Sequence, residues 1–330
     1  MPVHLTDPGV AEAGTLTGVI FNVQRHSTED GPGIRTTVFL KGCPMRCPWC
    51  HNPEGMSPPP ELVWYALRCI GDRDCLAACP RDALTLTPQG MVIDREACDA
   101  CGKCEEACPA AALEVIGKAR TLEDVASEAL RDRVFYEKSG GGVTLSGGEP
   151  GMQLLFSLAL MARLKQEGIH VAVDTCGSLL PERFRALVDP ADLVLYDLKI
   201  MDPALHKEYT GVDLARVLAN GEWLAETGKP LWVRTPVIPG YTDTEENIRA
   251  IARFIAEKLP NDERYDLLAF NNTCEAKYGR LDRSFCLAGA SPLSEEQMQR
   301  LHAAALEEGV ACASWSGVTR PERHMCEKDG

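Results

Sequence analysis

The sequence predicts an α/β fold, a partial (β/α)6 barrel with a small cysteine-rich domain inserted after the first strand. First, six short runs of apolar and β-branched residues alternate with helical patterns, which indicates a parallel sheet covered by helices. Second, ten of the 15 cysteines lie between positions 43 and 108. Third, the Pro-rich segment 57–61 (SPPPE) marks a boundary between the first strand and the cysteine-rich text.

Each element follows from its residues. The expected strands are 36–40, 141–148, 170–175, 193–199, 230–238 and 265–270. The expected helices are 121–137 (Thr121 as N-cap, Asp124 in the capping-box position), 152–167, 181–188, 203–227, 243–258 and one that begins near Ser294. Six strands are fewer than the eight of a closed barrel, and active-site residues are expected at their carboxyl ends. The domains are then 1–59 with 117–330 for the barrel, and 60–116 for the insert.

Composition excludes several classes of protein. The formal net charge is -14, and a phosphate-binding surface needs a basic face, so no nucleic-acid partner is expected. No apolar run approaches the ~20 residues that span a bilayer. The first residues have no basic segment followed by an apolar one, so we expect no signal peptide. We therefore expect a cytoplasmic monomer that does not bind membranes.

The strongest motif is a C-x3-C-x2-C loop directly after the first strand, made by Cys43, Cys47 and Cys50. Three thiolates can hold three irons of a four-iron cluster and leave the fourth iron without a protein ligand. An open coordination position usually marks chemistry rather than structure. The alternative is half of a zinc site, with His51 as a fourth ligand.

Two ferredoxin-like runs follow. The second run, Cys98-x2-Cys101-x2-Cys104-x3-Cys108-Pro109, has the spacing in which the fourth cysteine binds the other of two clusters. The first run has Asp72 where its second cysteine should be. The crossed rule then gives one cluster to Cys79, Cys98, Cys101 and Cys104, and the other to Cys69, Cys75, Cys108 and Asp72. The Asp72 cluster is either ligated by the carboxylate or completed by water, and a three-iron form is expected on oxidation; zinc is the alternative for both sites.

The chain resembles radical S-adenosylmethionine (SAM) enzymes, specifically the activating enzymes of glycyl radical enzymes of the pyruvate formate-lyase-activating type. The resemblance is carried by DGPGIRTTVFLKGCPMRCPWCHNPE, SGGGVTLSGGEP (139–150), VDTCG (173–177) and LYDLK (195–199), and more loosely by RTPVIPG (234–240). It implies that the open iron is chelated by SAM. One electron would then give methionine and a 5′-deoxyadenosyl radical, which removes a hydrogen atom from a glycine of the client enzyme.

The resemblance also implies a set of SAM contacts. Glu149 would accept from the SAM ammonium group, and Lys199 would meet its carboxylate. A monovalent cation is expected near Asp174 and Asp197. The complete expected set is Trp49, Cys50, His51, Gly147, Gly148, Glu149, Asp174, Thr175, Asp197, Leu198, Lys199, Arg234 and Asn271. Asn271 stands where the family has a histidine against the nucleoside, and the segment Asp30–Arg35 is expected near the client's glycine.

Other interpretations remain at this stage. The insert is either an electron relay from flavodoxin or ferredoxin or a docking surface for the client. A second enzyme hypothesis is a radical SAM enzyme that modifies a small molecule or a short peptide, and a third is an electron carrier or zinc scaffold. Clients of the diol, choline, isethionate, hydroxyproline and arylacetate types are not distinguished. No role is expected for the remaining cysteines, at 176, 274, 286, 312 and 326.

Overall fold

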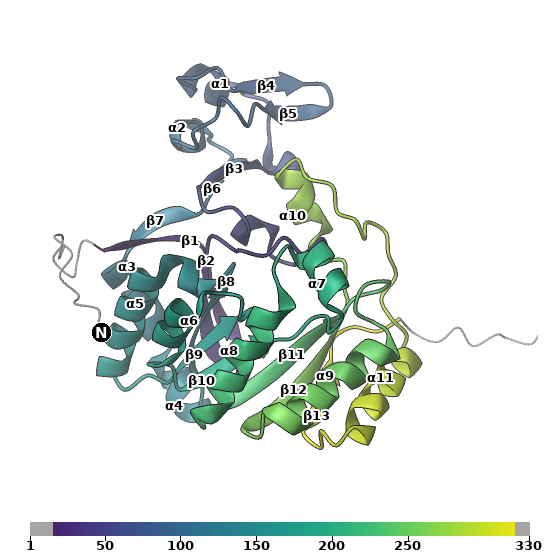
Figure 1. Ribbon diagram of the computed structural model, residues 1–330. Helices are drawn as coiled ribbons and strands as arrows, with labels where there is room; N and C mark the ends of the chain where they lie inside the picture. Colours follow the sequence, from purple (N-terminus) through teal and green to yellow (C-terminus); the bar gives the residue numbers. More distant parts are fainter. Residues whose placement is uncertain (1–15, 321–330) are drawn as a thin grey trace, which may run out of the picture.

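A nine-stranded sheet forms the centre of the computed structural model, which describes residues 16–320 (Figure 1). The order of its strands is β13-β12-β11-β10-β9-β8-β2-β1-β7. The strands are β1 (Thr17–Ser27), β2 (Arg35–Leu40), β7 (Lys118–Thr121), β8 (Gly142–Gly147), β9 (Val171–Thr175), β10 (Leu193–Asp197), β11 (Leu231–Val237), β12 (Asp262–Ala269) and β13 (Ala313–Ser316). Cys326 lies outside the described residues.

All six expected strands are present and run parallel, and a seventh joins them. β13 pairs in parallel with β12 at the edge of the sheet, so the described barrel has seven parallel strands rather than six. Its sequence, ASWS, has no apolar run, and all four residues are half-buried. The antiparallel strands β1 and β7, on the other side of β2, were also not predicted.

The helices differ from prediction at two breaks. The expected helix 121–137 is two helices, because Arg131 and Asp132 interrupt it. The expected helix 203–227 is interrupted at Gly211, whose φ of 82° is the left-handed conformation typical of a helix C-terminus, and a second helix begins at Leu214. The helices are α3 (Leu122–Leu130), α4 (Arg133–Ser139), α5 (Leu154–Gln166), α6 (Pro181–Val188), α7 (Pro203–Thr210), α8 (Leu214–Glu226), α9 (Glu245–Lys258), α10 (Glu275–Arg280) and α11 (Glu295–Glu307).

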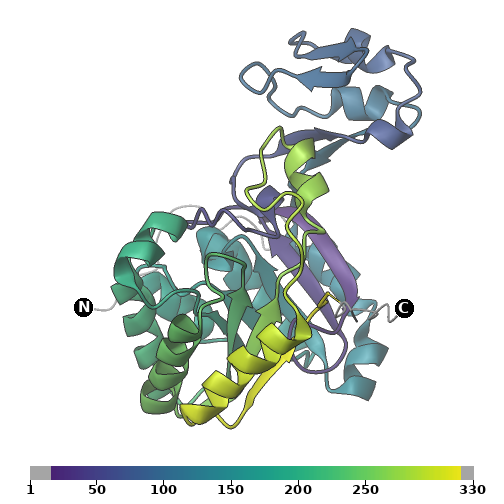
Figure 2. The same cartoon turned by 90° about the vertical axis from the view of Figure 1, so that its right-hand side faces the viewer.

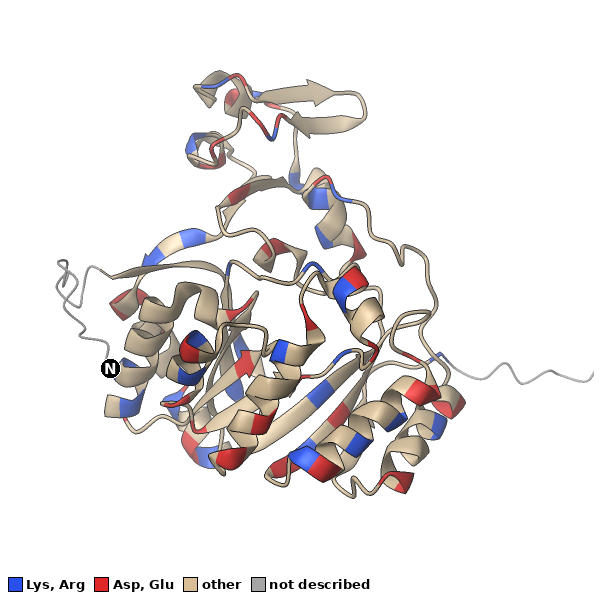
Figure 3. Ribbon diagram, in the orientation of Figure 1, with Lys and Arg blue, Asp and Glu red and all other residues tan. Residues whose placement is uncertain are grey.

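The helix caps agree with the sequence in two places. The Thr121 hydroxyl accepts from the Asp124 amide at the start of α3, but Asp124 does not return a capping-box bond. Ser294 begins α11 with a complete capping box to Gln297. On the surface, Arg249 and Arg253 of α9 pair with Glu307 and Glu308, next to the end of α11, which joins the two helices at the lower right of Figure 3.

The cysteine-rich segment forms a separate small unit at one end of the sheet, beside α10 (Figures 1 and 2). Its strands are β3 (Glu61–Trp64), β4 (Leu84–Thr87), β5 (Gly90–Ile93) and β6 (Leu113–Ile116), with β3 paired to β6 and β4 to β5. Two helices of one turn each, α1 (Asp74–Ala78) and α2 (Lys103–Ala107), complete it. No helix among the described residues is long and apolar enough to cross a membrane.

Candidate active site

The cysteine loop begins immediately after β2, at the carboxyl end of the strand. Cys47 is buried, and so are Met45 and Trp49 between the three cysteines. Burial raises the pKa of Cys47 to about 11 and that of Cys50 to about 12. Because thiolates are the metal-binding form, a cluster must displace these protons when it binds.

A cavity of about 510 Å³ opens from this loop into the interior of the sheet. That volume suits a ligand of the size of a nucleoside derivative. The three cysteines share its wall with the carboxyl ends of the parallel strands. Of the expected SAM contacts, those that line it are Trp49, Cys50, His51, Gly147, Gly148, Asp174, Asp197, Lys199, Arg234 and Asn271.

The two glycines of the GGE element bring β8 against the cysteine loop. Gly147 has a φ of 111°, and a Cβ there would lie 2.4 Å from the backbone nitrogen of Leu40. A Cβ on Gly148 would lie 2.3 Å from the carbonyl oxygen of Gly42. The Gly148 amide donates to the Leu40 carbonyl at 2.8 Å. Glycine is therefore required here for the approach of two backbone segments, in addition to any approach to a ligand.

Glu149 is fully buried and does not line the cavity. Its Oε2 atom accepts from the Thr175 hydroxyl (2.8 Å), the Cys176 amide (2.9 Å) and the Cys176 thiol (3.1 Å). Burial, followed by the neighbouring Cys176, raises the pKa of Glu149 well above its usual value. Thr175 and Leu198 are likewise buried outside the cavity wall, so direct SAM contacts of these three residues stay predictions.

Four charged side chains from three adjacent strands form one network. Arg234 of β11 pairs with Asp174 of β9 and, at 3.2 Å, with Asp197 of β10. Lys199 donates to Asp197 at 2.7 Å. Burial raises the pKa of Asp174, whereas the two cations overcome burial and lower that of Asp197. The network thus presents a cationic lysine and an anionic aspartate at one wall of the cavity.

Aromatic side chains pack against Trp49 and His51 of the cysteine loop. The Trp49 ring packs 5.0 Å from that of Tyr241, centroid to centroid. His51 lies edge-on to Phe270, and burial lowers its pKa, which favours the neutral imidazole. Asn271 lines the cavity, although its Oδ1 atom accepts from the Thr273 hydroxyl of its own loop at 2.5 Å. Apolar ring surface with a few polar atoms is typical of a nucleoside site.

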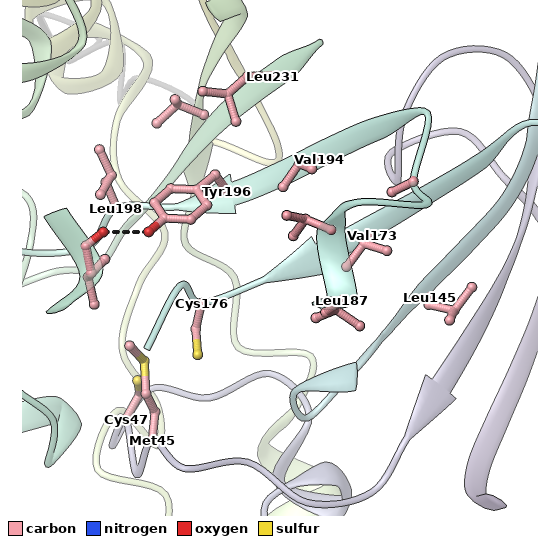
Figure 4. Close-up of a cluster of buried hydrophobic side chains, with 14 of the residues drawn as sticks. Met45, Cys47, Leu145, Val173, Cys176, Leu187, Val194, Tyr196, Leu198 and Leu231 are labelled. Atoms are coloured by element: carbon pink, nitrogen blue, oxygen red, sulfur yellow. Dashed lines mark hydrogen bonds between the residues drawn. The ribbon is translucent and has the colours of Figure 1, made fainter. Parts of the chain in front are cut away.

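Cys176 lines the cavity, although no role was expected for it from the sequence. It follows β9 and lies across from Cys47 and Met45 of the cysteine loop (Figure 4). The neighbouring Cys43 thiol, together with burial, raises the pKa of the Cys176 thiol well above the usual value. Its position directly after Asp174 and Thr175, at the end of a predicted strand, is the sequence feature that could have placed it in the site.

The insert contains two further cysteine-lined spaces. Cys79, Cys98, Cys101 and Cys104 line the first, and Cys69, Asp72, Cys75 and Cys108 line the second. Among residues 16–320, no three His, Cys, Asp or Glu side chains converge on a point that suits a single metal ion. In both spaces the donor set is rich in sulfur, which fits an iron–sulfur cluster.

Comparisons with known proteins agree with this arrangement. Residues 37–255 match the radical SAM superfamily. The isethionate sulfite-lyase activating enzyme of Oleidesulfovibrio alaskensis is 42% identical over 299 residues, covering 88% of this chain and 96% of the relative. The (2S)-3-sulfopropanediol sulfolyase activating enzyme of Bilophila wadsworthia is 40% identical over 87% of this chain and 95% of its own. The benzylsuccinate synthase activating enzyme of Thauera aromatica is 38% identical over 89% of this chain and 91% of its own.

The matches cover nearly the whole length of these relatives, and the superfamily match includes the cysteine loop and the strand ends that carry Asp174, Asp197 and Arg234. The superfamily match implies a [4Fe-4S] cluster and SAM, which the three thiols and the adjoining cavity fit. The chain therefore belongs to the radical SAM superfamily and, within it, to the enzymes that activate glycyl radical enzymes by reductive cleavage of SAM.

Proposed function

We propose that this chain binds SAM in the cavity beside Cys43, Cys47 and Cys50 and delivers the resulting radical to a glycine of an organosulfonate-cleaving enzyme. The observation that supports this most is that the three thiols, the paired glycines and the charged network line one cavity. The relatives named for isethionate and 3-sulfopropanediol enzymes favour a client that cleaves a carbon–sulfur bond.

Each wall would bind a different part of SAM. Lys199 would pair with the methionine carboxylate, while Asp197 stays ionised and fixes the lysine. Trp49, His51 and Asn271 would face the adenosine. Glu149 would hold the β9 end in place through Thr175 and Cys176 rather than meet the ligand directly. When bound, the cluster supplies the electron that cleaves SAM and the vacant iron that chelates it.

The client would enter from the side of the sheet. Glu29 and Asp30, from the loop before β2, line the same cavity as the cysteines. The Asp30 carboxylate is fixed by the Ser27 and Thr37 hydroxyls at 2.6 and 2.7 Å. This loop would hold the glycine-bearing segment of the client, and the incomplete barrel would leave room for it.

We also propose that residues 60–116 are a ferredoxin-type domain with two clusters that relays electrons from flavodoxin or ferredoxin to the cysteine loop. A second cleft supports this direction: Cys98 and Asp99 of the insert line it together with Ser57 and Arg283 of the barrel. The cluster of Cys98 would then lie nearer the barrel. The alternative role, docking of the client, is distinguished by measuring client binding after removal of the insert's cysteines.

Two smaller proposals complete the function. A monovalent cation would bind at Asp174 in competition with Arg234, whose guanidinium already pairs with that carboxylate. Its test is the dependence of SAM cleavage on sodium and potassium. The chain is proposed to act as a monomer, which sedimentation of the reconstituted enzyme measures.

The client is tested with a panel of purified, unactivated enzymes. Isethionate sulfite-lyase, 3-sulfopropanediol sulfolyase and benzylsuccinate synthase are each incubated without oxygen with this chain, SAM and a low-potential reductant. A glycyl radical on either organosulfonate enzyme, at a rate above that on benzylsuccinate synthase, supports the proposed client class. Radical formation on benzylsuccinate synthase alone contradicts it.

A further inference from the structure

The small unit is an internal repeat with an offset of 29 positions. β3 (Glu61–Trp64) corresponds to β5 (Gly90–Ile93), α1 (Asp74–Ala78) to α2 (Lys103–Ala107), and β4 (Leu84–Thr87) to β6 (Leu113–Ile116). The pairing of β3 with β6 and of β4 with β5 exchanges the outer strands of the two halves. Each cluster space therefore takes residues from both halves in the same way.

The backbone of the two halves agrees at three pairs of matched positions. Each half has three residues with positive φ at corresponding positions: Gly71 (76°) and Ala100 (54°), Arg73 (69°) and Gly102 (83°), and Asp82 (50°) and Ala111 (48°). The Ala83 amide donates to the Cys79 sulfur at 3.3 Å, and the Ala112 amide to the Cys108 sulfur at 3.3 Å. Asp72 and Cys101 each lie between two of these matched residues.

Burial follows the same correspondence. Cys75 and Cys104 are buried, and Cys69 and Cys98 are half-buried. Asp72 and Cys101 are both exposed. Asp72 is thus exposed to solvent like Cys101, its counterpart in the second half. It lines the space that is also lined by Cys69, Cys75 and Cys108.

We propose that a carboxylate oxygen of Asp72 is the fourth protein ligand of the cluster held by Cys69, Cys75 and Cys108. This inference rests on the proposed presence of two clusters in the insert. Oδ1 of Asp72 accepts from the Asp74 amide at 3.2 Å, which orients the side chain. Its Oδ2 atom makes no hydrogen bond within residues 16–320 and is free to bind iron.

An oxygen ligand gives this cluster one distinct iron. Carboxylate is a harder ligand than thiolate and binds the iron of a sulfide cube less well. A mild oxidant such as ferricyanide removes one electron, and the four-iron cluster of charge 2+ then releases one Fe²⁺ and becomes a three-iron cluster of charge 1+. The Asp72 carboxylate is released with that iron. The cluster of Cys101 has four thiolates and keeps its iron under the same conditions.

The test separates this cluster from the cysteine loop, whose own open iron is also labile. The full chain with Cys43, Cys47 and Cys50 changed to Ala is reconstituted without oxygen, and three-iron spins are counted by EPR after one equivalent of ferricyanide. We expect one three-iron cluster per chain with Asp72, none with Asp72→Cys, and two with Cys101→Asp. If the triple variant does not fold, the same series is measured in the native loop with SAM bound, and the differences between variants are compared.

Ligation by Asp72 is distinguished from a water ligand by Asp72→Ala. Loss of a direct ligand should weaken Fe²⁺ binding to the three-iron form at least as much as loss of an outer partner, about tenfold. Asp74→Ala, which keeps the backbone amide, is the matched control and should bind Fe²⁺ as the parent does. Equal Fe²⁺ affinity in Asp72→Ala and its parent would overturn the proposal, as would unchanged three-iron spins in Asp72→Cys. Fewer than two clusters by iron and sulfide analysis would instead overturn the proposed function of the insert.

Discussion

Arg234 joins two carboxylates from different strands: its guanidinium pairs with Asp174 of β9 and Asp197 of β10 while it projects from β11. Its side chain is only 9% exposed, so both pairs lie in a poorly hydrated wall of the cavity. Lys199 is the other cation of this network. The arrangement of the charged side chains at the proposed site for the SAM carboxylate therefore depends on one arginine.

Removing Arg234 should destabilise the protein and weaken SAM binding. Arg234→Ala leaves two half-buried aspartates, 16% and 21% exposed, with a single cation. Breaking a fully buried pair costs about 3–5 kcal/mol, so a loss at or below the lower end of that range is expected. Denaturant unfolding without oxygen measures the loss, and isothermal titration measures SAM affinity. The control is Lys207→Ala, because Lys207 and Asp213 are 53% and 65% exposed and such a surface pair contributes about 0–1 kcal/mol. Similar losses in the two variants would contradict the central place of Arg234.

The cysteine loop should be separable from the insert. Cys47→Ala removes a ligand of the only predicted cluster with an open iron, so reductive formation of 5′-deoxyadenosine should stop. The insert's EPR signals should remain, since its cysteines line different spaces. Cys312→Ala, outside all these cavities, should retain SAM cleavage. Survival of 5′-deoxyadenosine formation in Cys47→Ala would show that the catalytic assignment is wrong.

Gly177 should tolerate no side chain. It has a φ of 66°, and a Cβ there would lie 2.1 Å from the hydroxyl of Tyr196. Gly177→Ala combines left-handed strain of about 1–2 kcal/mol with overpacking of about 1–3 kcal/mol. Gly211→Ala, also left-handed with a φ of 82° but with nothing within 4 Å, should lose only the first amount. Unfolding free energies of the two variants compare these costs, and equal losses would contradict the close contact with Tyr196.

The sequence predicted the parallel strands because each is a near-continuous apolar run, such as Val171–Thr175. β13 was not predicted because it is a half-buried edge strand that contains two serines. Its position is determined by pairing with β12. The helix break at Gly211 was not predicted because the helical periodicity of apolar residues continues on both sides of it. Tertiary contacts, not local pattern, determine these features.

In the candidate site, too, local sequence pattern predicts some features and tertiary contacts determine the others. Spacing alone grouped Cys43, Cys47 and Cys50, and order along parallel strands brought Asp174, Asp197 and Arg234 to one edge. The resemblance implied a contact between Glu149 and SAM, which stays a prediction. The sequence did not indicate that the Glu149 carboxylate accepts hydrogen bonds from Thr175 and Cys176, because spacing does not give the direction of a side chain at a loop. The contact between Cys176 and the cysteine loop depends on how the ends of β9 and β2 are arranged, which no local sequence motif predicts.

Formation of a radical on a glycine of another protein is the activity that defines this family. The most direct measurement is EPR of an unactivated isethionate sulfite-lyase after anaerobic incubation with this chain, SAM and a low-potential reductant. We expect a glycine-centred doublet that grows with time, is lost on changing the client's target glycine to Ala, and is absent with the Cys47→Ala variant. SAM cleavage that proceeds with no glycyl radical on this or any other glycyl radical enzyme, while a small molecule or short peptide is modified instead, would contradict it.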